Sequence, residues 1–304
     1  MIIKINRDYA LKSKKAINLL DRANMESCDY SICTLVTKFD EYDQMLASFH
    51  ANGFIEPACE FLYIDNSNNN QFDAYTGINA LLRWAKGKYI IVCHQDIELL
   101  QDDIEELGTK LTELEALDPN WAIAGNSGGV YQGSLNDLAV RISDPHGENI
   151  AQGPFPSRVT GLDENFIVIK AQANLALSGN ISGFHLYATD MSIIASVLGF
   201  RSYVIDFHLK HKSRGIVREG DDLYPGEIGY PEIRETMVKK YRLAFATQWV
   251  SSPTTEFFIF PQIFSRIRYN LARACELLWL SRHTYRMRLI NLLRKKRNAP
   301  KKFE

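Results

Sequence analysis

Apolar runs alternate with amphipathic segments along the first third of the chain. The run at residues 30–39 is continuous and rich in β-branched side chains, which is typical of a strand buried on both faces of a parallel sheet. Similar runs follow at residues 60–65 and 88–96, and segments with helical spacing, each ending in glycine, occupy residues 41–53 and 74–87. Strand–helix–strand–helix–strand at this spacing predicts an α/β fold with an open, mostly parallel sheet flanked by helices.

The other segments carry weaker patterns. Residues 1–30 predict a short strand and then a helix up to about Asn24. The sequence indicates no function for these residues. The Gly- and Ser-rich run at residues 125–134 predicts a mobile loop near a substrate. Residues 182–215 predict a helix ended by Gly199, then a strand and a histidine-containing loop.

Acidic and histidine side chains fall where the predicted strands and helices begin or end. Ligands of open α/β sheets bind at the carboxyl ends of the strands, which puts Asp65 and the segment His94–Asp96 on one edge of the sheet. Further along, Asp190 stands at the start of a predicted helix, and His211 stands in the loop after a strand. We therefore treat these positions as candidate site residues.

Each candidate also has a structural alternative. Asp65 could close an Asx-turn in its asparagine-rich segment, and Asp96 could cap a helix that begins directly after it. Asp190 could likewise be a helix cap. A lone histidine is most often structural, and His208 competes with His211 for any role in a site.

Composition narrows the class of protein. The chain has 304 residues, of which 46% are hydrophobic, enough for one substantial core and an appendage. Its five cysteines show neither a C-x-x-C pair nor a zinc spacing, which favours a reduced, cytoplasmic protein with Cys33 and Cys93 in the core. The N-terminal segment does not resemble a signal peptide, and no run of about 18 apolar residues predicts a spanning helix.

Charge is divided unevenly along the chain. The net charge of −1 combines +10 in residues 261–304, which hold 12 basic and two acidic side chains, with −11 in residues 1–260. Apolar positions in the basic segment follow helical spacing, and Trp279 lies among them. A basic amphipathic helix of this kind fits an anionic membrane surface as partner of residues 261–302.

The basic tail has two alternative uses. The helix could pack on its own domain and leave a solvated basic face. It could also bind nucleic acid, but no nucleic-acid-binding motif or aromatic-interleaved basic module is present, so no nucleic-acid partner is expected.

The order of the candidate residues and the segments around them resemble the family 2 glycosyltransferases of the GT-A fold. The segments are "LVTKFDEYDQML", "YIDNSNNN", "GINALLRWAKGKYIIVCHQDIEL", "VTGLDENFIVIK", "GFHLYATDMSIIASVLGFRSYVI" and "HKSRG", between about Tyr30 and Gly215. The chain is similar to the subset that has His-Gln-Asp in place of Asp-x-Asp. The resemblance implies a transferase that uses a nucleotide-diphospho-sugar donor and a divalent metal, Mn²⁺ or Mg²⁺.

The resemblance also implies a role for each matching residue. Asp65 would contact the nucleobase or ribose, and Asp96 would bind the metal that bridges the diphosphate. His211 would complete the metal shell, and Asp190 would be the general base of an inverting displacement. Asp163, in "GLDENF", matches an acid near the sugar and the acceptor.

Two positions depart from the family pattern. His94 replaces the first acid of Asp-x-Asp, so the ligand set has one negative charge fewer, and His94 either joins the metal shell or faces the nucleotide. Thr189 stands where many relatives carry an acid before the catalytic aspartate, which leaves Asp190 as the acid of its turn.

These observations predict four segments and one leading function. The segments are an N-terminal extension at 1–29, a GT-A catalytic domain at 30–215, a mixed acceptor-side segment at 216–260 and the basic helical tail at 261–304. The predicted function is transfer of a sugar to a saccharide or lipid-linked saccharide at the inner membrane face, as in polysaccharide biosynthesis.

Two other functions remain alternatives. A non-catalytic sugar-nucleotide-binding or membrane scaffold of the same fold would be compatible with His94 in place of an acid. A sugar-phosphate nucleotidyltransferase would share the nucleotide-binding sheet, although the segment after the first long strand lacks a Gly-rich basic loop.

Overall fold

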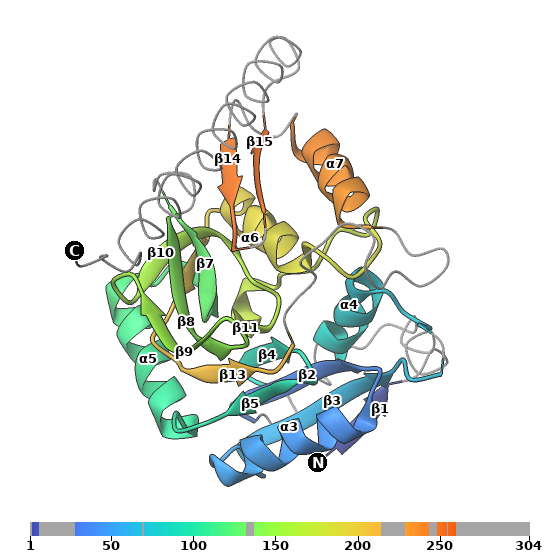
Figure 1. The fold of residues 1–304 in the computed structure, drawn as a ribbon, viewed down its shortest axis with the longest axis vertical. Helices are drawn as coiled ribbons and strands as arrows, with labels where there is room; N and C mark the ends of the chain where they lie inside the picture. The colour runs from blue at the N-terminus through green and yellow to red at the C-terminus, as the bar shows by residue number, and fades with distance from the viewer. Residues whose placement is uncertain are drawn as a thin grey trace, which may run out of the picture. The chain divides into compact units, whose positions relative to one another are not determined.

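The computed structural model describes residues 2–5, 28–68, 70–131, 137–213, 229–242, 248–253 and 255–259 (Figure 1). The chain forms two compact units. The first comprises Met1–Met237 with Val250–Phe257 and contains every candidate site residue, and the second comprises Val238–Trp249 with Phe258–Glu304. The predicted basic tail, the helix up to Asn24 and residues 216–228, 243–247, 254 and 260 of segment 216–260 lie outside the described residues.

The N-terminal part of the sheet is parallel. Its strands are β1 (Ile2–Ile5), β2 (Tyr30–Val36), β3 (Cys59–Asp65) and β4 (Tyr89–Cys93), arranged in the order β1-β3-β2-β4. Helices α3 (Phe39–Ala51) and α4 (Ala74–Trp84) connect β2 to β3 and β3 to β4. These elements match the predicted alternation, so the α/β class with a sheet flanked by helices is confirmed.

Beyond β4 the sheet becomes mixed. The further strands are β5 (Ile97–Leu99), β6 (Trp121–Gly125), β7 (Ser127–Val130), β8 (Leu138–Asp144), β9 (Gly147–Gln152), β10 (Ser157–Leu162), β11 (Phe166–Lys170), β12 (Arg201–Val204) and β13 (Leu209–His211). They continue the sheet in the order β4-β11-β6-β12-β10-β7-β8-β13-β5, with β9 paired to β8. Most of these pairs are antiparallel, and β12–β6 and β13–β8 are parallel.

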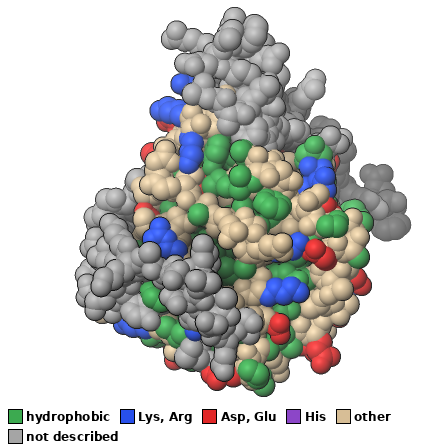
Figure 2. All heavy atoms as spheres, turned by 180° about the vertical axis from the view of Figure 1, so that it is seen from behind, with side chains coloured by type: hydrophobic (Ala, Val, Ile, Leu, Met, Phe, Trp, Pro, Cys, Tyr) green, Lys and Arg blue, Asp and Glu red, His purple; other side chains and the backbone are tan. Residues whose placement is uncertain are grey.

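The remaining elements are α5 (Ile104–Leu117), the 3₁₀ turn η1 (Ala171–Ala173), α6 (Tyr187–Val197), α7 (Tyr230–Tyr241) and a two-stranded sheet of β14 (Gln248–Ser251) and β15 (Glu256–Ile259). Among the described residues, no helix is long and apolar enough to cross a membrane. The face drawn in Figure 2 has hydrophobic side chains interspersed with charged side chains of both signs.

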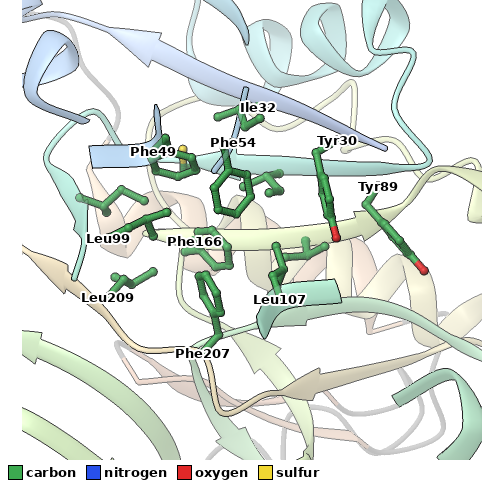
Figure 3. Close-up of a cluster of buried hydrophobic side chains, with 14 of the residues drawn as sticks. Tyr30, Ile32, Phe49, Phe54, Tyr89, Leu99, Leu107, Phe166, Phe207 and Leu209 are labelled. Carbon is green, nitrogen blue, oxygen red and sulfur yellow. The ribbon is translucent and has the colours of Figure 1, made fainter. Parts of the chain in front are cut away.

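Alternating side chains of the central strands bury both faces of the sheet. One face packs against α3 and α5. In the cluster there, the Phe54 ring lies between Phe49 and Tyr30, and Leu107 and Phe166 belong to the same cluster (Figure 3). On the opposite face α4 lies against β2 and β3, and α6 lies against β10 and β12. Because both faces are covered, the strands read as continuous apolar runs, which explains why the pattern predicted them correctly.

One prediction about local structure is wrong, and one structural alternative is excluded. Residues 125–130 do not form a loop, because most of them belong to β6 and β7, which are paired and buried. A Cβ on Gly128 would come within 2.7 Å of the Gly161 carbonyl oxygen, so glycine permits close strand packing there. Asp96 does not cap a helix either, because β5 follows it and α5 begins only at Ile104, capped by Asp103.

Gly87 has a packing role rather than the predicted role of helix stop, since α4 already ends at Trp84. A Cβ at this position would lie 2.5 Å from the Ser31 nitrogen and 2.7 Å from the Tyr89 carbonyl oxygen. Gly87→Ala should therefore lower the free energy of unfolding by about 1–3 kcal/mol, measured by denaturant titration.

Gly179→Ala is the matched control, because Gly179 is exposed and a Cβ added to it would have no heavy atom within 4 Å. If Gly87→Ala and Gly179→Ala have the same free energy of unfolding, a Cβ at position 87 fits without cost, and the proposed packing role of Gly87 is wrong.

Candidate metal and nucleotide site

Two histidines and one aspartate meet at the carboxyl end of β4. The Nδ1 atom of His94 lies 3.4 Å from Nε2 of His211, and Nε2 of His211 lies 3.4 Å from Oδ1 of Asp96. The third distance, from His94 Nδ1 to Asp96 Oδ1, is 3.9 Å. All three side chains are partly buried, and one ligand atom of each lies within 4.8 Å of the others.

Backbone pairing brings these residues together. After β4 the chain turns at His94–Asp96 and continues as β5, which pairs antiparallel with β13 so that Ile97 stands opposite His211. The Asp96 carbonyl accepts a 3.0 Å hydrogen bond from the Lys212 nitrogen, and the His94 nitrogen donates a 3.0 Å bond to the Asn165 carbonyl. The site is therefore fixed by three segments that are distant in sequence.

Electrostatics favours the charged forms of Asp96 and His211 and the neutral form of His94. Burial raises the pKa of Asp96, but the hydrogen bond and charge of His211 outweigh burial and hold that pKa well below its ordinary value. Burial lowers the pKa of His211, but its hydrogen bond to Asp96 outweighs this and raises the pKa overall. Burial, with the neighbouring His211, lowers the pKa of His94, which favours a neutral imidazole.

The donor set fits a divalent cation. Ligand atoms about 2.1 Å from one ion and roughly 90–110° apart are about 3.0–3.4 Å from one another, close to the distances found here. An anionic carboxylate and a neutral imidazole both offer lone pairs to such an ion. Two imidazoles with one carboxylate suit Mn²⁺ and other transition metals better than Mg²⁺, which prefers oxygen ligands.

A cleft of about 470 Å³ opens beside these residues. Its lining includes His94, Asp96, Ser213, Leu35, Thr37, Glu41, Gln95 and two lysines, Lys38 and Lys212. The Gln95 side chain accepts from the Thr37 and Lys38 nitrogens at 2.7 and 3.0 Å, so it ties the β4–β5 turn to the β2–α3 loop. The cleft thus combines a candidate cation site with basic side chains suited to phosphate.

Asp65 lies at the end of β3, in register with Val36 of β2, but it is not among the residues that line the cleft. Its carboxylate accepts a 2.7 Å hydrogen bond from Lys4 and a 2.6 Å bond from Ser67. These contacts, with that of Lys4 the strongest, lower the pKa of Asp65 to about 2. The predicted edge position of Asp65 is therefore found, and its predicted contact with a nucleoside remains a prediction.

Asp163 and Glu164 follow β10 and approach the site from the turn that supports His94. Asp163 is partly exposed, its Oδ1 accepts from Asn165, and its Oδ2 has no hydrogen-bond partner among the described residues. The Asp163 charge acts on both His94 and His211. Glu164 is buried beside it and accepts a hydrogen bond from the Leu186 nitrogen, and burial followed by the Asp163 charge raises the pKa of Glu164 to about 8.

Asp190 is fully buried in the first turn of α6. Its Oδ1 accepts from the Ser178 hydroxyl at 2.7 Å and its Oδ2 from the Ser178 nitrogen at 2.8 Å. It is not the helix cap, because Leu186 occupies that position with φ 63°. Asp190 thus fastens the segment before α6 to the helix, and its predicted role as a base remains a prediction.

His208 is excluded from the three-residue cluster of described side chains. Its Nε2 lies 2.9 Å from the Ser143 hydroxyl, and its backbone nitrogen donates to Asp102 at 2.6 Å. The structure brings His211, rather than His208, to Asp96.

Comparison with known sequences identifies a family. No protein-family profile matches the chain. A protein of Fuscovulum blasticum called "ATP synthase subunits region ORF 6" is 36% identical over 219 residues, which make up 71% of this chain and 84% of that protein. The chain belongs to the ORF 6 family. That family name states no activity.

Several glycosyltransferase structures show a remote likeness. S. aureus TarS aligns over 72% of this chain and 40% of its own, with 11% identity and a TM-score of 0.48. GalNAc-T7 with UDP, GalNAc and Mn²⁺ aligns over 71% of this chain and 48% of its own, with 9% identity and a TM-score of 0.47. The mannosyltransferase PcManGT from Pyrobaculum calidifontis with GDP-Man and Mn²⁺ aligns over 71% of this chain and 61% of its own, with 7% identity and a TM-score of 0.41. The chain spans less than two thirds of each of these proteins. Since every TM-score is below 0.5, the functional inference rests on the site geometry of this ORF 6 family member.

Sequence reasoning missed three residues that shape the site. Tyr187 lies 3.0 Å from His94 Nε2 through its hydroxyl, Gln95 joins the two loops beside the cleft, and Lys4 pairs with Asp65. Gln95 lies inside the His-Gln-Asp motif, so its position is a usable signal. Tyr187 and Lys4 give none, because their contacts are with residues 93 and 61 positions away in the chain.

Proposed function

We propose that this protein is a metal-dependent glycosyltransferase that uses a nucleotide-diphospho-sugar donor. The observation that supports this best is the cluster of His94, Asp96 and His211 at the carboxyl-end edge of an α/β sheet, beside a cleft with two lysines. Edges of this kind are where open α/β sheets bind their ligands. A divalent cation bound by the cluster would neutralise charge on the departing diphosphate.

The chain's own residues have distinct tasks in this proposal. His94, Asp96 and His211 would hold the cation. Lys38 and Lys212, which pair with Glu41 at 2.9 Å and Glu98 at 3.6 Å, would turn toward the phosphate oxygens when a nucleotide binds. Asp65, at the end of the neighbouring strand, would reach the ribose or base, which requires Lys4 to share its carboxylate or to move aside.

Sugar transfer also needs a base that takes up a proton. In an inverting displacement the hydroxyl oxygen of the acceptor sugar bonds to the anomeric carbon of the donor, while the bond from that carbon to the diphosphate oxygen breaks. The bonding electron pair leaves with the diphosphate, and the hydroxyl proton passes to a carboxylate. The family resemblance assigns this role to Asp190, which is fully buried. The structure favours Asp163, because Asp163 is partly exposed and its Oδ2 has no hydrogen-bond partner among the described side chains.

We expect Asp163→Asn to lower turnover by about 10²–10⁴-fold, because a positioned base contributes that much, while Mn²⁺ binding is retained. Asp190→Asn should instead lower the melting temperature, since it weakens hydrogen bonds to a buried charge worth about 1.5–3 kcal/mol each. Turnover is measured as nucleotide release, and unfolding by circular dichroism.

The opposite pattern would assign the base as the family resemblance does. In that case Asp190→Asn would lose turnover at unchanged stability and Asp163→Asn would stay active.

Metal dependence gives the direct test of the proposed enzyme class. Purified protein is incubated with UDP- and GDP-linked sugars, and hydrolysis to the nucleoside diphosphate is followed with Mn²⁺, Mg²⁺ or EDTA. We expect Mn²⁺ to support more activity than Mg²⁺ because the donor set contains two imidazoles. Asp96→Ala should abolish Mn²⁺-dependent nucleotide binding and turnover.

Each competing function has its own outcome. Nucleotide binding without hydrolysis or transfer, with any tested cation, would support a non-catalytic scaffold. Formation of a nucleotide sugar from a sugar phosphate and a nucleoside triphosphate would support nucleotidyl transfer instead. Glu113→Ala serves as a control, because Glu113 is an exposed acid on α5 that pairs with Lys110, and neither residue lines the cleft or belongs to the cluster.

We further propose that the acceptor is a saccharide or lipid-linked saccharide and that residues 261–302 hold the enzyme on an anionic membrane surface. The +10 charge of residues 261–304 supports the electrostatic part of this attachment. Full-length protein should float with liposomes that contain anionic lipid, and less so with neutral liposomes or at high salt.

The matched variant replaces the four basic residues of the run Arg294–Arg297 by glutamine, which leaves eight of the 12 basic residues after Pro261. A smaller fraction of this variant should float with anionic liposomes. Equal recovery of both proteins under all conditions would contradict membrane attachment through the tail.

A further inference from the structure

The hydroxyl of Tyr187 lies directly behind one histidine of the cluster. It is 3.0 Å from His94 Nε2 and 3.0 Å from the Glu164 carbonyl oxygen. Tyr187 is buried at the start of α6, 93 residues away from His94 in the chain. This contact is therefore a product of the fold, and neither the metal cluster nor the cleft lining includes Tyr187.

The direction of these two hydrogen bonds follows from their partners. A carbonyl oxygen can only accept, so Tyr187 donates its single hydroxyl proton to Glu164. The phenol oxygen is then available as an acceptor, and the proton in the bond to His94 must come from Nε2. If Tyr187 donated to His94 instead, two acceptor oxygens would face each other at 3.0 Å.

The consequence lies on the other side of the imidazole ring. A neutral histidine with its proton on Nε2 has a bare lone pair on Nδ1. Nδ1 is the atom that faces His211 Nε2 and Asp96 Oδ1, at 3.4 and 3.9 Å. The opposite tautomer would point a proton into the space between the three side chains and so block binding of a cation there.

The support behind His94 is anchored on one short turn. Asn165 accepts from the His94 backbone nitrogen at 3.0 Å, and Glu164, the preceding residue, accepts from Tyr187. Glu164 also accepts from the nitrogen of Leu186, which precedes Tyr187. The backbone and the ring of His94 are thus both held by residues 164–165, the ring through Tyr187.

We propose that Tyr187 is a positioning residue that fixes His94 in the Nε2-protonated tautomer and thereby makes His94 Nδ1 a ligand atom for the divalent cation. This inference rests on the proposed function only in that the cluster binds a cation. It assigns His94 to the metal shell rather than to a contact with the nucleotide. Partners of this kind are worth about 10–100-fold in metal affinity.

The test compares Tyr187→Phe with wild type in the full-length protein. Isothermal titration with MnCl₂, alone and with UDP present, should show a Kd raised about 10–100-fold in the variant. Long-range ¹H–¹⁵N spectra of the histidine rings, recorded without metal, should show His94 protonated at Nε2 in wild type and a mixture of tautomers in Tyr187→Phe. His94→Gln identifies the His94 signals.

Tyr203→Phe is the matched control. Tyr203 is also buried and donates its hydroxyl proton at 2.7 Å, but to Asp118, which is not part of the cluster. This variant loses a comparable hydrogen bond, so it should leave Mn²⁺ affinity and the His94 tautomer unchanged. A purely structural effect of losing a buried hydroxyl would appear in both variants.

The failures of the two proposals differ. If wild-type protein binds no Mn²⁺, with or without UDP, both the proposed metal site and the metal dependence of the proposed function are wrong. Wild-type binding of Mn²⁺ with an equal Kd for Tyr187→Phe, or an Nδ1-protonated His94 in wild type, would overturn only the role of Tyr187.

Discussion

The antiparallel ladder between β5 and β13 is the contact on which the candidate site depends. It places Ile97 opposite His211 and so brings together two histidines that are 117 residues apart in the chain. The Lys212–Asp96 backbone hydrogen bond extends this contact beyond the strands. Because Leu209 and Lys210 of β13 also pair with β8 in parallel, the strand that ends at His211 is held from both sides. A side-chain cluster held this way needs little reorganisation to accept a cation.

Hydrogen bonds and burial within the cluster decide which of its side chains carry charge. His211 and Asp96 stabilise each other's charged forms, whereas burial lowers the pKa of His94 and so favours its neutral form. The carboxylate attracts a cation, and the neutral imidazole can share a lone pair with it. Under the proposed function, a histidine in place of an acid at position 94 would still supply a ligand atom for a divalent cation, provided that the ring presents Nδ1.

The sequence predicted the parts of this arrangement that depend on local pattern. Apolar runs buried on both sheet faces identified β2, β3 and β4 correctly, and the rule for sheet edges put Asp65 and His94–Asp96 at their carboxyl ends. The prediction of a loop at residues 125–130 failed because glycine signals both flexibility and close packing, and only the neighbouring strands decide between them. The choice of His211 over His208, the burial of Asp190 against Ser178 and the contact of Tyr187 with His94 arise from tertiary packing, which periodicity does not encode.

Pulsed electron paramagnetic resonance of Mn²⁺ bound to the full-length protein tests the central claim most directly. Modulation from ligand nitrogen reports imidazole bound to the metal, and selective ¹⁵N-histidine labelling identifies it as protein-derived. Coordination by His94, Asp96 and His211 predicts two imidazole nitrogens on Mn²⁺, one of which is lost in His94→Gln and the other in His211→Gln. A bound Mn²⁺ with oxygen ligands alone would contradict the account.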